Sequence, residues 1–266
     1  MTQPEQAQAI QWGAGWQTCS APLVFAVHAL HFVLEPGGWP QAEVHRAEIE
    51  SCFAARQRDN PHLWNGDILM LDQASLRRED TAEGVVLHGA FRRTDFASFL
   101  WWRMQGWPDM GLRNAFSLAA LEGADGGFVL GRMGAHTSSA GHVYFPGGTP
   151  DLSDVTAQGH VDLTASSLRE MGEETGLQPD DIVHDGGFIA VEDGPRLALL
   201  HRLVFAEPAD VLAARIRAFL GREELPELAD MVVVHGAEDL LPTIAPFTVA
   251  YMRARWAGAL SPAIRP

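Results

Sequence analysis

The stretch from Ser167 to Leu177 is the strongest constraint on how this chain folds, because it packs three carboxylates into five residues. On a helix these side chains lie at positions i, i+3 and i+4 and share one face. They are Glu170, Glu173 and Glu174. The opposite face of the stretch is mostly apolar and can be buried. Gly176 suits the left-handed position just past a helix C-terminus. The stretch therefore predicts an amphipathic helix that presents three carboxylates together.

Two interpretations of this acidic face are open. Neighbouring carboxylates repel one another, and a hard cation such as Mg²⁺, which binds carboxylates, waters and substrate phosphates, would remove that cost. A solvated acidic surface is the alternative, because acidic runs are common. Arg169 lies four residues before Glu173 and can pair with it across one turn. The sequence of the helix alone does not distinguish a metal site from a solvated face, so the motifs around the helix are needed.

Charge and composition narrow the classes of function. The formal net charge of −15 over 266 residues argues against a nucleic-acid-binding surface. An anionic substrate would then need a metal, or local Arg and His, to offset this charge. Cys19 and Cys52 are too few for a disulfide framework or a zinc site. The first 17 residues lack a signal pattern, and no run approaches a membrane span. We expect a cytoplasmic protein that acts on a small molecule and does not bind membranes.

The pattern of apolar residues divides the chain near residue 110. The first part, 1–110, reads as a smaller α+β extension with strands at 21–27, 31–35, 66–72 and 84–91, helices at 40–58 and 94–105, and a charged loop at 73–83. The second part, 111–266, has strands at 114–121, 127–132, 142–145, 187–192, 196–206 and 231–235, and helices from about 164, at 208–221 and at 246–258. This alternation predicts an α/β layered domain with a mixed sheet.

The helix expected at 94–105 contains two adjacent tryptophans, Trp101 and Trp102. They could stack on a ligand base or pack the two halves of the chain together. We expect packing, since large aromatic side chains usually contribute to buried cores. The extension would then serve substrate recognition, or it would form the surface of a homodimer.

The motifs of the second part resemble the signature of the Nudix hydrolase family. Pro146-Gly147-Gly148 precedes the helix, and residues 169–177 match the family's Arg-Glu-apolar-any-Glu-Glu-any-Gly-apolar segment completely. The resemblance covers about 113–266 and implies a Nudix α/β/α sandwich. It also implies that Mg²⁺ or Mn²⁺ assists cleavage of the diphosphate bond in a nucleoside diphosphate linked to another group.

The first half of the signature departs from the family pattern. Gly148 lies 21 positions before Arg169, whereas the family spacing is 14, so seven residues are inserted and no Glu lies between them. Asp154, six positions after Gly148, keeps a carboxylate in the register of the family's Glu. Asp162, just before the helix, competes for that role, although we favour a helix-capping role for it.

Two weaker resemblances bear on the substrate. The segment 132–154 is similar to the coenzyme A-cleaving Nudix branch at four positions: Arg132, Gly141, Phe145 and Asp151. The branch has a second Arg where this chain has Thr137. The stretch 58–66 resembles the extension of a UDP-glucose-cleaving branch. The expected substrate is therefore of coenzyme A or nucleotide-sugar type.

The chemistry assigns expected roles to a small set of residues. Glu170, Glu173 and Glu174, with the backbone of Gly148, are the expected metal ligands. Arg169 would fix one carboxylate rather than touch the substrate.

The general base and the phosphate contacts are left open. The base is one of the helix glutamates, Glu192 or Glu227. Glu192 could instead be a solvated turn acid, and Glu227 could instead be an extra metal ligand. Arg132 and Arg196 would neutralise substrate phosphates unless they are ordinary ion-pair residues. His136 and His142 flank the approach to Gly147, where a histidine is usually structural.

A second class of function competes with the enzyme. A Nudix-type sensor would bind a nucleotide without cutting it, and loss of the glutamates would favour that reading. All three glutamates are present. The sequence therefore favours a metal-dependent diphosphatase over a sensor.

Overall fold

The computed structural model describes residues 22–258, and the predictions for residues 1–21 and 259–266 lie outside this range. Its strands are β1 Leu23–Val27, β2 Ala29–Gly38, β3 Asp67–Asp72, β4 Arg77–Asp80, β5 Val85–Asp95, β6 Leu112–Glu122, β7 Phe128–Met133, β8 Val143–Tyr144, β9 Gly147–Gly148, β10 Ile182–Asp193, β11 Arg196–Phe205 and β12 Leu228–Val234. Its α-helices are α1 Pro40–Val44, α2 Arg46–Asp59, α3 Phe96–Met104, α4 Leu163–Thr175, α5 Ala209–Leu220 and α6 Pro246–Trp256.

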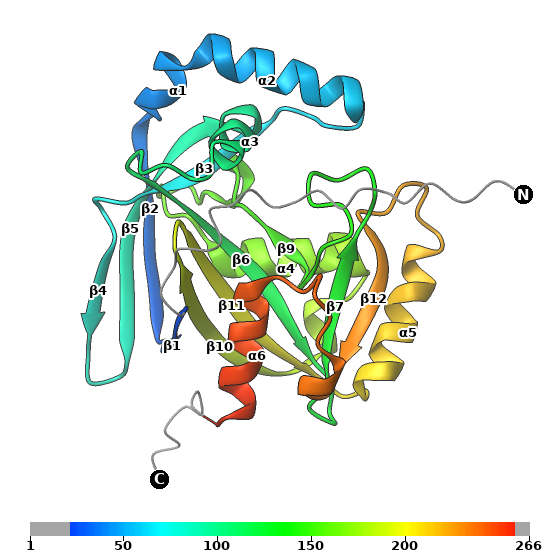
Figure 1. Cartoon of the computed structure of the whole chain (residues 1–266). Coiled ribbons are helices and arrows are strands. Elements are labelled where there is room, and N and C mark those ends of the chain that lie inside the picture. Colours follow the sequence, from blue (N-terminus) through cyan, green and yellow to red (C-terminus); the bar gives the residue numbers. More distant parts are fainter. Residues whose placement is uncertain (1–21, 259–266) are drawn as a thin grey trace, which may run out of the picture.

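The strands join into one mixed sheet (Figure 1), whose main path is β1-β10-β11-β6-β3-β5-β2. The pair of β11 and β6 is parallel, and β10 and β11 are antiparallel. The sheet is continuous across the expected boundary at residue 110, because β3 pairs with β6 and β1 pairs with β10. The division into parts 1–110 and 111–266 stays a prediction.

Two helical layers cover the second half of the sheet. Along β6, Leu118 faces a core cluster shared with α6, and the next residue, Ala119, faces a cluster shared with α5. This alternation follows from the period of two in a strand. Helix α6 therefore covers one face and α4 with α5 the other, as Figure 1 shows. The layered α/β sandwich with a mixed sheet that the sequence predicts is confirmed.

The tryptophans of α3 lie in a separate core cluster with α1, α2 and β3. Trp101 and Trp102 are 3% and 1% exposed, and the Trp102 indole donates a hydrogen bond to the Pro108 carbonyl at 2.8 Å. Packing rather than ligand stacking is therefore confirmed for both side chains, but their cluster lies almost entirely within the first half of the chain and includes only Leu112 from the second. Dimerisation stays a prediction.

Two local predictions were wrong. The charged stretch 73–83, expected to be a loop, contains β4, which pairs with β5 from Arg77 to Asp80. The helix expected at 40–58 is interrupted at His45, which ends α1 and begins α2. The stretch 73–83 contains a strand because it pairs with β5, and its own pattern of apolar residues does not indicate this pairing.

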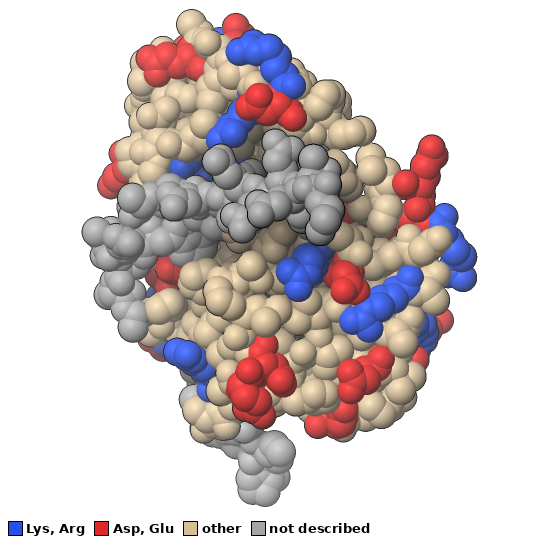
Figure 2. Space-filling model, turned by 45° about the vertical axis from the view of Figure 1, so that its right-hand side comes forward, with Lys and Arg blue, Asp and Glu red and all other residues tan. Residues whose placement is uncertain are grey.

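The surface carries the charges that the composition implies. On the part of the face that the structure describes, Figure 2 shows acidic and basic side chains interspersed, without a continuous basic patch. Within residues 22–258, no helix is both long and apolar enough to cross a membrane.

Candidate active site

The acidic helix α4 begins and ends at the residues that the sequence predicts. The side chain of Asp162 accepts hydrogen bonds from the backbone N–H groups of Thr164 (3.1 Å) and Ala165 (2.9 Å), so it is a helix cap. Gly176 ends the helix in the left-handed conformation at φ +72°. Met171 on the inner face is fully buried. The capping interpretation of Asp162 is confirmed.

The short strand β9 brings a glycine pair against α4. Gly147 has φ +137°, and a Cβ there would lie 2.3 Å from the Ser117 carbonyl oxygen, so only glycine fits. Its N–H donates to Oε1 of Glu174 at 3.0 Å. A Cβ on Gly148 would lie 3.6 Å from Oε1 of Glu170. Both glycines therefore bring backbone directly to the helix glutamates.

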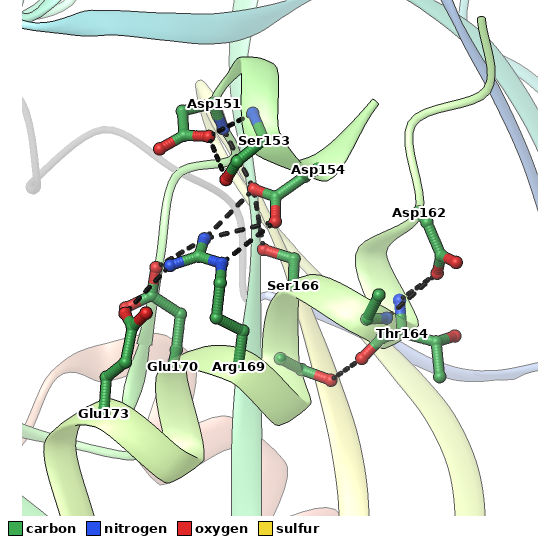
Figure 3. A network of polar contacts seen from close by, with 11 residues as sticks. Asp151, Ser153, Asp154, Asp162, Thr164, Ser166, Arg169, Glu170 and Glu173 are labelled. Atoms are coloured by element: carbon green, nitrogen blue, oxygen red, sulfur yellow. Dashed lines mark hydrogen bonds and ion pairs between the residues drawn. The ribbon is translucent and has the colours of Figure 1, made fainter. Parts of the chain in front are cut away.

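Arg169 is the centre of a carboxylate network, shown in Figure 3. Its Nη2 lies 3.1 Å and 3.2 Å from the two carboxylate oxygens of Asp154. It also lies 2.9 Å from Oε1 of Glu170, and Nη1 lies 3.0 Å from Oε2 of Glu173. The arginine thus holds two helix carboxylates in place, as a supporting residue would.

Asp154 is the loop carboxylate that meets this network. It is 5% exposed, accepts a hydrogen bond from the hydroxyl of Ser166 at 3.1 Å, and accepts another from the N–H of Asp151 at 3.0 Å. These contacts orient it toward Arg169 rather than toward the open side of the helix. Of the two aspartates that competed for the family's Glu position, Asp154 is the one that contacts the glutamate network.

Glu174 carries an unsatisfied buried oxygen. The residue is 7% exposed; Oε1 accepts from Gly147, while Oε2 has no hydrogen-bond partner among the described residues. Burial, followed by the charges of Glu227 and Glu170, raises its pKa well above the ordinary value. Burial also raises the pKa of Glu170 to about 7, against the opposing effect of Arg169. These carboxylates therefore ionise at a cost that a cation would offset.

The glutamates line a cavity of about 160 Å³ that we call the acidic groove. Five of its nine lining residues are glutamates: Glu170, Glu173, Glu174, Glu223 and Glu227. Glu227 was a candidate from the sequence, and burial raises its pKa. Glu223 was missed, because it lies in a charged turn after α5 and no spacing connects it to the motif.

The fit of the acidic groove to a cation can be judged from its donors. It offers carboxylate oxygens, which suit Mg²⁺, and one of them is buried without a partner. Across residues 22–258 no three His, Cys, Asp or Glu side chains already stand as ligands of one ion. The reason is visible at Arg169, whose ion pairs draw Glu170 and Glu173 toward it. The donor set fits, and these two side chains would have to turn to use it.

A second cavity, of about 450 Å³, adjoins the acidic groove, and we call it the aromatic pocket. Glu227 lines both cavities, and Gly147 and Gly148 line the pocket as well. Six aromatic side chains line it: Phe96, Phe99, Trp107, Phe116, Tyr144 and Phe247. Arg196, predicted as a phosphate contact, lies in this pocket, 2.7 Å from Asp193, and is 4% exposed. His142 also lines it.

Other predicted residues lie away from both cavities. Glu192 forms an ion pair with Arg113 at 3.1 Å, and Arg132 pairs in register with Asp230 of β12. Neither lines the acidic groove or the aromatic pocket. Burial raises the pKa of Glu227, and the nearby His136 partly opposes this rise. The His136 ring packs edge-on against His62. The geometry thus brings Glu227 and Arg196 to the site and leaves Glu192 and Arg132 outside it.

Comparison with known proteins gives matches among solved structures only. No family model matches the sequence, and no curated protein matches it. A Nudix hydrolase from M. smegmatis, RenU, is 18% identical, with 57% of this chain and 88% of that chain covered and a TM-score of 0.36. The MutT protein from Methanosarcina mazei Go1 is 16% identical, with coverage of 55% and 94% and a TM-score of 0.35.

A third match is the E. coli ORF135 protein, at 20% identity, with coverage of 55% and 94% and a TM-score of 0.31. All three TM-scores lie below 0.5, and each match spans little more than half of this chain. These likenesses assign no function to this chain.

Proposed function

We propose that this chain is a metal-dependent hydrolase of the Nudix type, which cleaves the diphosphate bond of a nucleoside diphosphate linked to another group. The observation that carries the proposal is the placement of Glu174. One of its oxygens is fixed by the Gly147 N–H, and the other is buried without a partner in a groove of five glutamates. Burying an ionised carboxylate without a partner destabilises the fold, and a bound cation would offset that free-energy cost.

Glu170, Glu173 and Glu174 would hold Mg²⁺ or Mn²⁺, together with the backbone carbonyl of Gly148. A bound divalent cation neutralises the charge of a diphosphate and lowers the pKa of a water molecule. The glycine pair lets the backbone approach closely enough to contribute.

Arg169 would position the glutamates without contacting the substrate. Its guanidinium is engaged by Asp154, Glu170 and Glu173 together, and multiple ion pairs of this kind fix side-chain orientation. When Glu170 and Glu173 turn toward the groove, the pair with buried Asp154 would keep the guanidinium beside them. Asp154 would therefore be the loop carboxylate of the signature, and it would act on the groove through Arg169 without lining the groove itself.

Glu227 is the favoured general base. It lines both the acidic groove and the aromatic pocket, so it stands where a diphosphate that enters from the pocket would reach the glutamates. Burial raises its pKa, which brings proton uptake closer to neutral pH. A helix glutamate remains the alternative, and Glu170 with a pKa of about 7 is the strongest of them.

The substrate would be a small nucleotide conjugate of coenzyme A or nucleotide-sugar type. Arg196 in the aromatic pocket supports an anionic or acceptor-rich substrate within a chain of net charge −15. A reducing, cytoplasmic setting belongs to the same proposal. The competing function is a nucleotide sensor with the same pocket and no turnover.

A panel of conjugates separates these two functions. Purified protein with Mg²⁺ would be incubated with coenzyme A, UDP-glucose, ADP-ribose, NADH and dinucleoside polyphosphates, and the products identified by mass spectrometry. We expect one class of conjugate to yield two phosphate-bearing products. Tight binding of a panel member without turnover, in Mg²⁺ and in Mn²⁺, would establish the sensor instead.

A further inference from the structure

The aromatic pocket is built by both halves of the chain. Phe96, Phe99 and Arg103 of α3, with Trp107 just after it, come from the first half. Asn114 and Phe116 of β6, Phe247 of α6 and Arg196 of β11 come from the second half. The pocket is therefore complete only where α3 and Trp107 of the first half meet the second half of the chain.

Trp107 is held in an unusual backbone conformation at this pocket. Its φ is +61°, and it is the one residue other than glycine with a positive φ in the described part of the chain. Bulky side chains rarely adopt this region, and such outliers cluster at ligand sites. Edge-on contacts with Trp102 (4.8 Å between centroids) and Phe99 (5.8 Å) hold the ring in place. The fold thus accepts an unfavourable backbone to keep this ring at the pocket.

The polar groups of the pocket are rich in donors. The Arg103 guanidinium lies 5.6 Å from the Phe99 ring centre and donates to the Ser138 carbonyl at 3.0 Å. The Arg196 guanidinium lies 5.7 Å from the Trp107 ring centre. A guanidinium has five N–H donors and no acceptor, so neither group can accept a hydrogen bond from a ring amino group.

Asn114 adds a third donor of the same kind. It is 7% exposed, and its side-chain oxygen accepts the hydroxyl hydrogen of Thr149 at 3.2 Å. An amide whose oxygen is engaged in this way has NH₂ donors to offer. Three side chains of the aromatic pocket therefore favour hydrogen-bond acceptors on whatever flat group lies among the aromatic rings.

We propose that the aromatic pocket binds the base of the substrate and selects bases with a carbonyl at C4 of a pyrimidine or C6 of a purine, such as uracil or hypoxanthine. Cytosine and adenine, which carry an amino group at that position, are disfavoured. Arg103 and Asn114 are the specificity-determining residues. The inference rests on the proposed function, because Glu227 lines both this pocket and the acidic groove where the diphosphate would be cut, and Gly147 of the pocket donates to Glu174 of the groove.

The test uses ligands that cannot be cleaved. Uridine, inosine, cytidine and adenosine 5′-monophosphates would be titrated into the full chain by calorimetry without metal. We expect UMP and IMP to bind roughly tenfold or more tightly than CMP and AMP, because an unpaired buried donor is costly. Equal affinity for the four, or no binding of any, would overturn the proposal.

Substitutions locate the preference within the pocket. Arg103→Met should remove it, Arg103→Lys should retain part of it, and Asn114→Asp, which exchanges a donor for an acceptor, should shift it toward CMP and AMP. Arg78→Met is the matched control, since Arg78 also lies over an aromatic ring, Phe25, at 4.6 Å, but outside the pocket. Circular dichroism spectra check that each variant folds. An unchanged preference in folded Arg103→Met and Asn114→Asp would overturn the proposal.

Failure of this proposal and failure of the proposed function give different results. A base preference without hydrolysis of any conjugate would leave the pocket assigned and remove the hydrolase. Hydrolysis with equal kcat/KM for uracil and adenine conjugates would leave the hydrolase and remove the base assignment.

Discussion

Arg169 Nη2 donates to both carboxylate oxygens of Asp154, at 3.1 Å and 3.2 Å, although the two residues lie 15 positions apart in the sequence. The aspartate is buried and the arginine, in the middle of α4, is partly exposed, so the pair anchors the acidic helix to the loop that precedes it. The same guanidinium contacts Glu170 and Glu173. Movement of Asp154 would therefore shift the two glutamate side chains that line the groove.

Asp154→Asn should weaken the site without changing any groove residue. Loss of the negative charge frees Arg169, and changes in residues that support metal ligands typically cost about tenfold to a hundredfold in metal affinity or activity. The measurement is the Mg²⁺ concentration dependence of kcat/KM on the conjugate that the panel identifies. Asp162→Asn is the matched control, since asparagine caps a helix as well as aspartate does. Equal effects of the two substitutions would contradict the supporting role of Asp154.

The stability of the metal-free protein should fall as pH rises. Burial raises the pKa of Glu170 to about 7 and the pKa of Glu174 well above its ordinary value. A carboxyl group with a raised folded pKa stabilises the fold fully below its unfolded pKa, about 4.3, and this contribution is lost as pH rises through the folded pKa. Above about pH 6.5, where histidine no longer gains protons on unfolding, the melting temperature in EDTA should therefore decrease toward pH 8, and excess Mg²⁺ should restore it.

Glu174→Gln provides the comparison for this pH effect. The amide cannot ionise, so the variant should melt at a higher temperature than the wild type above pH 7 in EDTA, and should gain less from Mg²⁺. A wild-type melting temperature that does not change with pH, or equal Mg²⁺ stabilisation of both proteins, would speak against the acidic groove as a cation site.

The two glycines of β9 should respond differently to alanine. At Gly147 a Cβ would lie 2.3 Å from a backbone oxygen and φ is +137°, so Gly147→Ala should cost more than about 2 kcal/mol or prevent folding. At Gly148 the nearest atom would be 3.6 Å away, which is ordinary contact, so Gly148→Ala should fold. Urea unfolding curves measure both. A stable Gly147→Ala protein would mean that β9 lies differently against β6.

A buried histidine behind α4 gives a separate pH effect. The His201 ring contacts the Ser167 hydroxyl at 2.8 Å and Asp185 at 3.0 Å, and it stacks on Phe188. Ser167 is fully buried and also donates to the Thr164 carbonyl, so this trio supports the helix and does not serve as a nucleophilic site.

Burial lowers the pKa of His201 against the opposing effect of Asp185. A depressed folded pKa means that stability is present above the unfolded value of about 6.5 and is lost as pH falls through the folded pKa. His201→Gln should therefore change the slope of the melting temperature against pH between about pH 6.5 and pH 5, so that less stability is lost on acidification than in the wild type. His184→Gln, on the exposed part of β10, should leave that slope unchanged. An unchanged slope in His201→Gln would contradict the assignment.

The sequence predicts what depends on local pattern. The acidic helix, its cap at Asp162 and its end at Gly176 all follow from residues within one or two turns, and the structure has each of them. Asp154 was a candidate through its register after Gly148, yet only the fold shows that it reaches Arg169 rather than the groove.

The aromatic pocket was beyond the reach of such patterns. Arg103, Trp107 and Asn114 lie in three different elements, and they meet because α3 packs beside the start of β6. The segment around Trp107 reads as a turn, but nothing in its composition indicates that a tryptophan rather than a glycine takes the left-handed position. Long-range packing sets these contacts, as it sets the pairing of β4.

Binding of Mn²⁺ to the acidic groove tests the central claim most directly. Free Mn²⁺ would be followed by electron paramagnetic resonance while the wild type, Glu174→Gln and Glu192→Gln are titrated. The account predicts stoichiometric binding by the wild type and by Glu192→Gln, whose glutamate pairs with Arg113 away from the groove. It predicts a loss of at least about tenfold in affinity for Glu174→Gln. Equal Mn²⁺ affinity in all three proteins would contradict it.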